Sequence, residues 1–391
     1  MLGFSTYAAL LPELRDAWHL SNAEAGVIAG MFFAGYVATV SYWTALTDRV
    51  DARRVYLAGS LITAAASAGF GLVASGFASA IVFQILLGVG IAATYMPGLR
   101  LLSDRLAGSG QSRSIATYTS FFGIGTALSL AAAGFIASSA GWRTAFVAAA
   151  VGPLLAGAAV FALLKALPIK AVASTGLSLF PVGAWRKVLS DRACAGYTAG
   201  YMAHCLELFG SRGWMVAFLA FSATLHTGPS FPWQLPAIAA VVNLLAVPAS
   251  IFGNEMALRL GRRRWILLVM AASGSCGMLV GFSAPWHWAV VLGLLIVYSM
   301  LVMAESGTLT AGLVAAAPAE LRGAAMGLYS LLGFGGGLLG PVVFGAALDA
   351  AGGSASPLAW VVAYAAIGAG CLLAPVVARI NSRRSPWNGS G

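Results

Sequence analysis

Long apolar stretches alternate with short polar loops along almost the whole chain. A helix needs about 20 mostly apolar residues to cross a bilayer, and stretches of that length recur throughout. The pattern predicts twelve membrane helices, at approximately 1–13, 23–45, 55–76, 78–101, 114–139, 144–166, 193–221, 234–256, 265–282, 285–313, 323–348 and 357–380. The first is too short to span, and we expect it either to be truncated or to be completed by residues before Met1.

Composition excludes a soluble protein. Hydrophobic residues make up 60% of the chain and charged residues only 9%, whereas a soluble domain carries roughly 25% charged residues. The net charge of +10 does not indicate nucleic-acid binding, because the cations lie in turns beside apolar runs, where they meet anionic headgroups. All four cysteines lie within apolar stretches without metal-ligand spacing, so we predict neither disulfides nor a metal site: Cys194, Cys205, Cys276 and Cys371.

The positions of the cations predict the orientation. Of 22 Lys and Arg residues, Arg15 and Arg143 fall outside if the amino terminus is inside, Arg212 falls within a helix, and the rest fall inside. Basic loops face the cytoplasm, so we expect both termini to be cytoplasmic in a bacterial inner membrane. The one long connection predicts the division into a six-helix bundle (1–166), a cytoplasmic linker (167–192), and a second six-helix bundle with a short cytoplasmic tail (193–391).

The two halves share a motif. Ser120–Gly125 and Ser330–Gly335 both read Ser-apolar-apolar-Gly-apolar-Gly, and an arginine precedes each at nearly the same distance. Internal repeats of this kind are typical of transporters, and small residues let neighbouring helices approach closely.

The loop after the second predicted helix contains Asp48, Arg49, Arg53 and Arg54. These residues resemble the Gly-x-x-x-Asp-Arg-x-Gly-Arg-Arg pattern of the major facilitator superfamily, with a spacer before the last arginines. The resemblance covers nearly the whole chain, although both glycines of the pattern are replaced.

This resemblance implies two pseudo-symmetric bundles that rock about a central cavity. It also implies that the loop is a conformational latch on the inner side, with Asp48 as its main residue. The alternative is a solvated basic turn that serves only topology. The family's helix-4 arginine is Gln84 here, and helix 5 lacks the signature of drug/proton antiporters. Both departures argue against a multidrug efflux pump.

Ionisable residues at membrane depth cost about 2.5–3.5 kcal/mol each on insertion scales, so they indicate function. Glu207, Glu305 and His204 are the predicted proton-coupling residues. Arg212 is predicted to bind a substrate carboxylate. The competing interpretation is structural: Glu207 pairs with Arg212 or His204 to pin a bent helix, or Glu305 pairs with Arg212.

Further substrate contacts are predicted on several helices. Tyr197 and Tyr201 share a helical face with His204. Tyr36, Tyr118 and Asn243 are candidate cavity residues, although aromatic residues at such positions more often pack or face lipid. Phe4, Tyr7, Phe32 and Phe33 are plausible cavity walls on the same basis.

No catalytic motif and no nucleotide-binding loop is present in the sequence. We therefore predict a non-enzymatic, cofactor-free secondary transporter, and the family resemblance implies a monomer. Its expected partners are a small solute, protons and lipid, with a weak preference for an organic anion. Three alternatives stay open: a proton-driven exporter of drugs or metabolites, an uncoupled facilitator, and a non-transporting membrane assembly or receptor protein.

Overall fold

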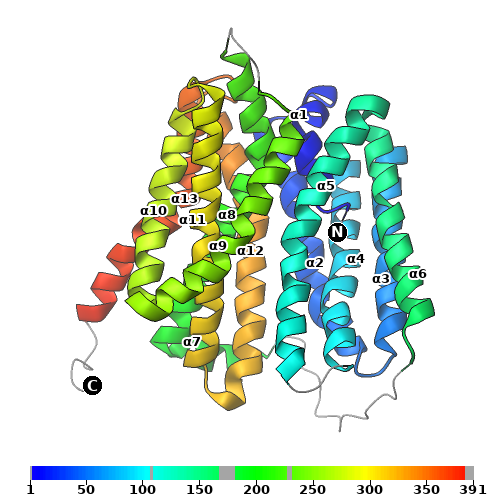
Figure 1. The fold of residues 1–391 in the computed structure, drawn as a ribbon, viewed down its shortest axis with the longest axis vertical. Coiled ribbons are helices and arrows are strands. Elements are labelled where there is room, and N and C mark those ends of the chain that lie inside the picture. Colours follow the sequence, from blue (N-terminus) through cyan, green and yellow to red (C-terminus); the bar gives the residue numbers. More distant parts are fainter. Residues whose placement is uncertain (1, 106–108, 167–180, 227–230, 384–391) are drawn as a thin grey trace.

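The structure, a computed structural model, describes residues 2–105, 109–166, 181–226 and 231–383. All regular elements within these residues are helical (Figure 1). The first half contains α1 (Thr6–Ala17), α2 (Asn22–Leu46), α3 (Ala52–Val73), α4 (Phe77–Ser103), α5 (Ser109–Ala149) and α6 (Val151–Leu163). The second half contains α7 (Val182–Ser190), α8 (Arg192–Thr224), α9 (Leu235–Leu260), α10 (Arg262–Phe282), α11 (Trp288–Ala316), the short 3-10 helix η1 (Ala319–Leu321), α12 (Arg322–Ala350) and α13 (Pro357–Arg383).

The prediction of twelve membrane helices is confirmed. Nine described segments are long and apolar enough to cross a membrane. One of them, Phe121–Leu163, has 43 residues, which is about twice the length that one crossing needs. Gly141 interrupts this segment with a φ of +81°, a conformation that glycine adopts without steric cost. The segment therefore has the length of two crossings, and α8 and the short helix α1 are the remaining two of the twelve helices.

The predicted linker contains a helix that hydropathy did not reveal. Residues 167–180 lie outside the described part of the chain, but α7 occupies 182–190 and packs against α8 and α12. It buries Val188, whereas Arg186 and Lys187 are exposed. The position of the boundary between the two halves stays a prediction.

Three helix pairs join the halves: α2 with α12, α5 with α9, and α1 with α8. The first two pairs correspond under the predicted repeat, since α9 is the counterpart of α2 and α12 is the counterpart of α5. Close approach depends on small residues. A Cβ atom at Gly26 of α2 would overlap the carbonyl of Pro341 on α12.

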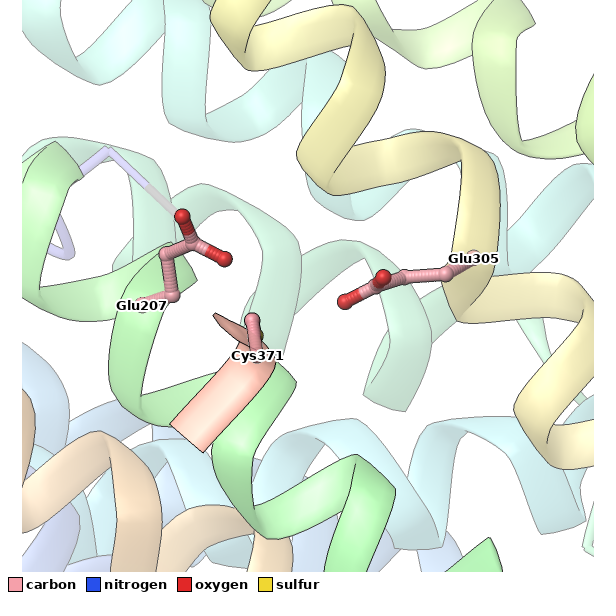
Figure 2. A group of neighbouring side chains, drawn as sticks. All are labelled: Glu207, Glu305 and Cys371. Atoms are coloured by element: carbon pink, nitrogen blue, oxygen red, sulfur yellow. The ribbon is translucent and has the colours of Figure 1, made fainter. Parts of the chain in front are cut away.

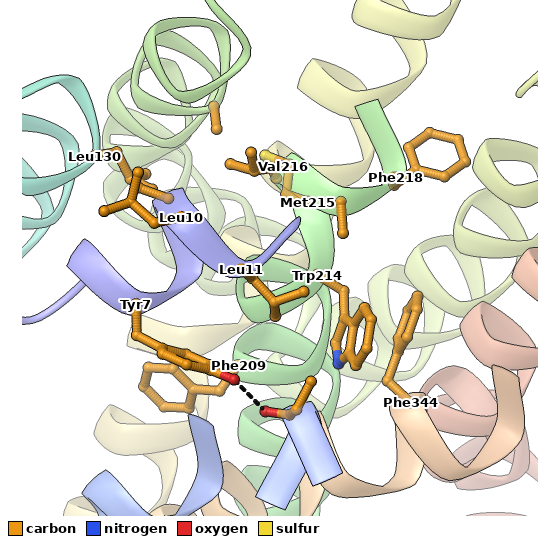
Figure 3. Packing of buried hydrophobic residues seen from close by; sticks show 14 of the residues in the cluster. Tyr7, Leu10, Leu11, Leu130, Phe209, Trp214, Met215, Val216, Phe218 and Phe344 are labelled. Carbon is orange, nitrogen blue, oxygen red and sulfur yellow. Dashed lines mark hydrogen bonds between the residues drawn. The ribbon is translucent and has the colours of Figure 1, made fainter. Parts of the chain in front are cut away.

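The apolar core is continuous across this junction (Figure 3). Leu11 of α1 is completely buried and lies near Trp214 of α8. Trp214 in turn stacks on Phe344 of α12, with ring centroids 5.5 Å apart. Tyr7 donates a hydrogen bond from its hydroxyl to the carbonyl of Ala25 at 3.1 Å.

Hydrogen bonds also join the halves at the end that the charge distribution predicts to face outside, called the outer end below. Asp349, near the end of α12, accepts from the backbone N–H groups of Asn22 (3.3 Å) and Ala23 (2.8 Å) at the start of α2. It also accepts from the Asn22 side chain at 2.7 Å. Arg15 donates to Asn22 (3.0 Å) and to Ser354 (2.7 Å). A carboxylate at a helix N-terminus is favourable, so this network joins the two halves at the outer end.

Candidate functional site

A small cavity lies where the two halves meet. Its volume is about 50 Å³, and its walls come from α1, α2, α4 and α5 on one side and from α8, α9 and α12 on the other. The space holds only a few water molecules, so the structure shows a contracted state of the site. The side chains that characterise the lining are Phe4, Ser5, Tyr7, Phe32, Phe33, Gln84, Thr126, Phe209, Arg212 and Asn243.

Arg212 is the charged side chain of this lining. One of its Nη atoms donates to the sulfur of Met303 on α11 at 3.4 Å. No carboxylate of the described residues lies within 4.0 Å of the guanidinium, so the predicted structural pairs with Glu207 and Glu305 do not form. A thioether is a weak acceptor, which leaves the guanidinium donors available to a ligand.

Aromatic rings form a wall of the cavity that Arg212 also lines. The ring centroids of Phe4 and Phe32 are 4.9 Å apart, those of Phe32 and Phe33 are 5.0 Å apart, and those of Phe33 and Phe209 are 4.4 Å apart. Phe209 belongs to α8, so this cluster crosses from the first half to the second. Such separations are typical of favourable aromatic pairs.

Two carboxamides complete the lining. Gln84 of α4 is buried, and it occupies the position where the family pattern has an arginine. Asn243 of α9 donates through Nδ2 to the carbonyl of Ala239 at 2.8 Å. Its Oδ1 atom is buried and accepts no hydrogen bond within the described structure, so an acceptor is left open at the cavity.

A second polar centre lies inside the second half, away from the cavity lining. Glu207 of α8 and Glu305 of α11 project toward each other, with Cys371 of α13 beside them (Figure 2). One carboxylate oxygen of each glutamate and the Sγ atom of Cys371 all lie within 4.8 Å of one another. His204 Nδ1 lies 2.9 Å from Glu305 Oε1, and Ser273 of α10 donates to Glu207 Oε2 at 2.9 Å. We call these five residues the acid cluster.

The acid cluster carries unusual polar groups for a membrane interior. Glu207 and Glu305 have no solvent-exposed surface, and His204 is 1% exposed. Glu207 Oε1 and Glu305 Oε2 lack hydrogen-bond partners in the described structure. Two adjacent carboxylates in a low-dielectric interior cannot both stay ionised, so the cluster retains at least one proton. His204 and Glu305 are close enough to share it.

The structure places the predicted tyrosines outside the cavity lining. Tyr197 packs against Gly312 of α11. Tyr201 stacks on Tyr329 of α12, with centroids 3.8 Å apart, and on His204 at 5.7 Å. In the first half, Tyr118 donates to the carbonyl of Tyr95 at 2.8 Å.

Tyr36 is the predicted tyrosine that contacts both halves. It is buried in α2, with its ring 4.7 Å from that of Phe334 on α12. For all four tyrosines, a role in binding the substrate stays a prediction.

The side-chain hydrogen bonds of the predicted latch residues Asp48 and Arg53 join them to other residues of the first half. Asp48 accepts a hydrogen bond from Arg100 of α4, which also donates to Thr47 at 2.8 Å. Arg53 donates to Asp51 at 2.7 and 2.8 Å and to the carbonyl of Leu164 at 2.5 Å. The loop therefore ties α2, α3, α4 and the end of α6 together.

The two remaining predicted latch residues differ in exposure from Asp51, an acid in the same loop. Arg49 and Arg54 are exposed. Partial burial acts to raise the pKa of the Asp51 carboxyl, but hydrogen bonds from Arg53 outweigh it and hold that pKa below its usual value. The role of this loop as a latch stays a prediction.

Several residues of the site lacked a recognisable signal in the sequence. Ser273 and Cys371 are small residues in apolar runs, and only the fold brings them to Glu207. Met303 is likewise recognisable only by its contact with Arg212. Gln84 was noticeable as a departure from the family pattern, and that departure could have marked it as a cavity residue.

Comparisons with known proteins agree with this architecture. A family model described as Major Facilitator Superfamily matches residues 1–341. Over 140 residues, the chain is 25% identical to the niacin transporter NiaP of Acinetobacter baylyi. That match covers 36% of this chain and 32% of NiaP, so it spans about a third of that relative's length.

Two solved structures share the fold over nearly their whole length. A bacterial homolog of the human lysosomal transporter Spinster, in an inward-facing and occupied conformation, matches with a TM-score of 0.73 at 15% identity, over 98% of this chain and 94% of that chain. The nucleoside transporter NupG matches with a TM-score of 0.72 at 12% identity, over 98% of each chain. Because the family model covers most of the sequence and the folds agree, this chain belongs to the Major Facilitator Superfamily and is a membrane transporter rather than an enzyme.

Proposed function

We propose that the protein moves small organic anions across the bacterial inner membrane by alternating access, in symport with protons. Both termini face the cytoplasm, and the monomer is the transporting unit. The observation that carries the proposal is Arg212, a cation in the cavity between the halves with no acidic partner among the described residues.

An arginine at this position is costly unless a ligand compensates its charge. Removing a charge from water costs several kcal/mol even after the protein relaxes. A carboxylate bound in the cavity offsets that cost and matches the planar guanidinium with two parallel hydrogen bonds. The matched relative is named for niacin, which bears a carboxylate, and this supports an anionic substrate.

The acid cluster supplies the proposed proton store. Its carboxyl groups are buried without a lysine or arginine partner in the described structure, so their charge depends on the protons that they hold. The short contact between His204 and Glu305 lets a proton reside on either residue. Ionisable groups at membrane depth commonly form proton relays.

Electrostatics links the store to the cavity. Arg212 and Glu207 belong to the same helix, and Arg212 contacts Met303, two residues before Glu305. The empty cavity exposes the cluster to the positive charge of Arg212, which favours release of a proton. A bound anion cancels that charge and favours retention, so anion and proton bind cooperatively.

Proteoliposome uptake tests the proposal. We expect wild-type protein to accumulate at least one labelled acid from a panel of acetate, benzoate and succinate when the outside is acidic. Arg212→Ala should lower kcat/KM for that acid about 100-fold, since truncating one partner of a buried charge pair costs 2–5 kcal/mol or more. Arg259→Ala, at an exposed arginine of the predicted inner end, is the matched control.

Equal uptake by wild type and Arg212→Ala for every acid of the panel would contradict anion binding at Arg212. Accumulation that follows a sodium gradient, with no response to pH, would instead assign the coupling to a different cation.

A further inference from the structure

We propose that the cavity selects aromatic monocarboxylates that also carry a hydroxyl or N–H donor. This substrate class rests on the anion transport proposed above and adds two features of the ligand to it, a ring and a second hydrogen-bonding group. Each feature has its own counterpart in the cavity lining.

The single cation limits the ligand to one negative charge. Arg212 is the charged group of the lining, and the other polar side chains are uncharged. A second carboxylate would enter the same enclosed space without a countercharge, which costs several kcal/mol. We therefore expect dicarboxylates to be rejected even when their size is suitable.

The ring preference follows from the aromatic wall. Phe4, Phe32 and Phe33 form an unbroken series of ring contacts that continues to Phe209. Phe209 lies one turn before Arg212 on α8, so a ring against the wall places its carboxylate near the guanidinium. Each favourable aromatic pair strengthens binding about two- to twelvefold beyond the effect of the area that it buries, and a saturated ring of the same size lacks this gain.

The donor preference follows from Asn243. Its Nδ2 atom is committed to the carbonyl of Ala239, which fixes the orientation of the amide. Asn243 is 2% exposed. Its Oδ1 atom accepts no hydrogen bond in the described structure. A buried acceptor without a partner costs about 1–3 kcal/mol, and a ligand hydroxyl or N–H group removes that cost.

Binding requires a wider cavity than the contracted one. A volume of about 50 Å³ cannot enclose a benzoate-sized molecule, because ligand pockets commonly measure 300–1,000 Å³. The hydrogen bonds that Asp349 accepts from Asn22 and Ala23 join the two halves at the outer end. The ligand therefore enters a state in which the halves stand further apart.

Competition assays in proteoliposomes test the inference. The probes are para-hydroxybenzoate, benzoate, cyclohexanecarboxylate and terephthalate, each competing with labelled benzoate. We expect para-hydroxybenzoate to compete about tenfold better than benzoate, and benzoate about fivefold better than cyclohexanecarboxylate. Terephthalate, a dicarboxylate, should compete only at the highest concentrations.

Asn243 variants assign the hydroxyl preference. Asn243→Leu should reduce the advantage of para-hydroxybenzoate over benzoate from about tenfold to below twofold, because no acceptor remains. Asn243→Ser keeps a hydroxyl and should preserve part of the advantage. Leu244→Ala, at the neighbouring half-exposed position, is the control, and thermal melting in detergent confirms that each variant is folded.

The outcomes separate this inference from the proposed function. If cyclohexanecarboxylate competes as well as benzoate, or if folded Asn243→Leu keeps the hydroxyl preference, the substrate class is wrong while anion transport stands. If no acid competes in an Arg212-dependent manner, the proposed function itself fails.

Discussion

The two halves of this transporter share one architecture but contribute opposite chemistry to its centre. The first half lines the cavity with rings, hydroxyl groups and the carboxamide of Gln84. The second half contributes Arg212 to the cavity and holds the acid cluster in its own interior. Within the described residues, the fully buried ionisable side chains His204, Glu207 and Glu305 all belong to the second half.

This difference suggests a division of labour. An aromatic wall recognises shape and changes little when a proton or an anion arrives. A group of buried charges responds strongly to both, because interactions between charges are strengthened in a low-dielectric interior. We therefore expect variants of the aromatic wall to change affinity and variants of the acid cluster to change coupling.

Glu305→Gln gives the largest expected effect. An amide cannot bind and release a proton as the proposed store at His204 and Glu305 requires, so a pH gradient of about one unit should no longer drive the roughly tenfold accumulation that one coupled proton permits. Exchange of labelled for unlabelled benzoate should persist. Uptake and counterflow in proteoliposomes measure the two activities, with Glu320→Gln, at an exposed acid, as the control. Retained accumulation would remove the acid cluster from the coupling mechanism.

Phe33→Leu tests the other side of the comparison. Phe33 contacts rings in both halves, Phe32 at 5.0 Å and Phe209 at 4.4 Å. Loss of these ring contacts should raise the KM for benzoate about tenfold, since aromatic pairs contribute about 0.5–1.5 kcal/mol each. The ratio of protons to anions should not change. A variant with normal KM but altered coupling would contradict the division between the halves.

Asp349→Asn addresses the hydrogen bonds that join the halves at the outer end. Losing a charged cap costs about 1 kcal/mol, which should increase the outward-open population about fivefold. Labelling of a cysteine at cavity residue Ala29 by an impermeant maleimide reports this opening. Asp16→Asn, at an exposed acid of the same end, should label like the parent. Unchanged labelling of the Asp349 variant would show that other contacts maintain the closure.

Asp51→Asn should have the smallest effect. Because Arg53 holds the Asp51 pKa below its usual 3.8, the ion pair stabilises the fold above that pH and loses its contribution as the pH falls through the lowered pKa. The pair is partly exposed, so its contribution is at most about 1 kcal/mol. Melting curves between about pH 5 and 3 should be flatter for Asp51→Asn than for wild type or Asp104→Asn. Parallel curves would exclude this pair as a source of acid sensitivity.

Hydropathy alone predicted the membrane helices well. Each helix must form its backbone hydrogen bonds internally and present apolar side chains over the fixed thickness of the bilayer core. The predicted helix 193–221 corresponds to α8 (Arg192–Thr224), and 323–348 corresponds to α12. The short helix α7 was missed because nine residues with two cations produce no span signal. Its boundaries depend on packing against α8 and α12 rather than on hydropathy.

The site was less accessible to sequence reasoning. Ionisable groups within apolar helices are rare, and this identified Glu207, Glu305, His204 and Arg212 as candidate site residues. Helical spacing then suggested partners along the same helix. The contact that forms is between His204 and Glu305, 101 positions apart, and no local pattern encodes such a pair. The hydrogen bond from Ser273 to Glu207 likewise joins two helices, and no local pattern predicts it. Composition shows which groups are costly, but only tertiary packing decides which of them meet.

Helix α8 bears both Arg212 and two members of the acid cluster, His204 and Glu207. A tilt or rotation of this helix would displace Arg212 and these two residues together, which would link the proposed anion site to the proposed proton store. If one proton accompanies each monovalent anion, the proposed cycle transfers no net charge. Membrane voltage by itself would not drive such a carrier, whereas acidity on one side would.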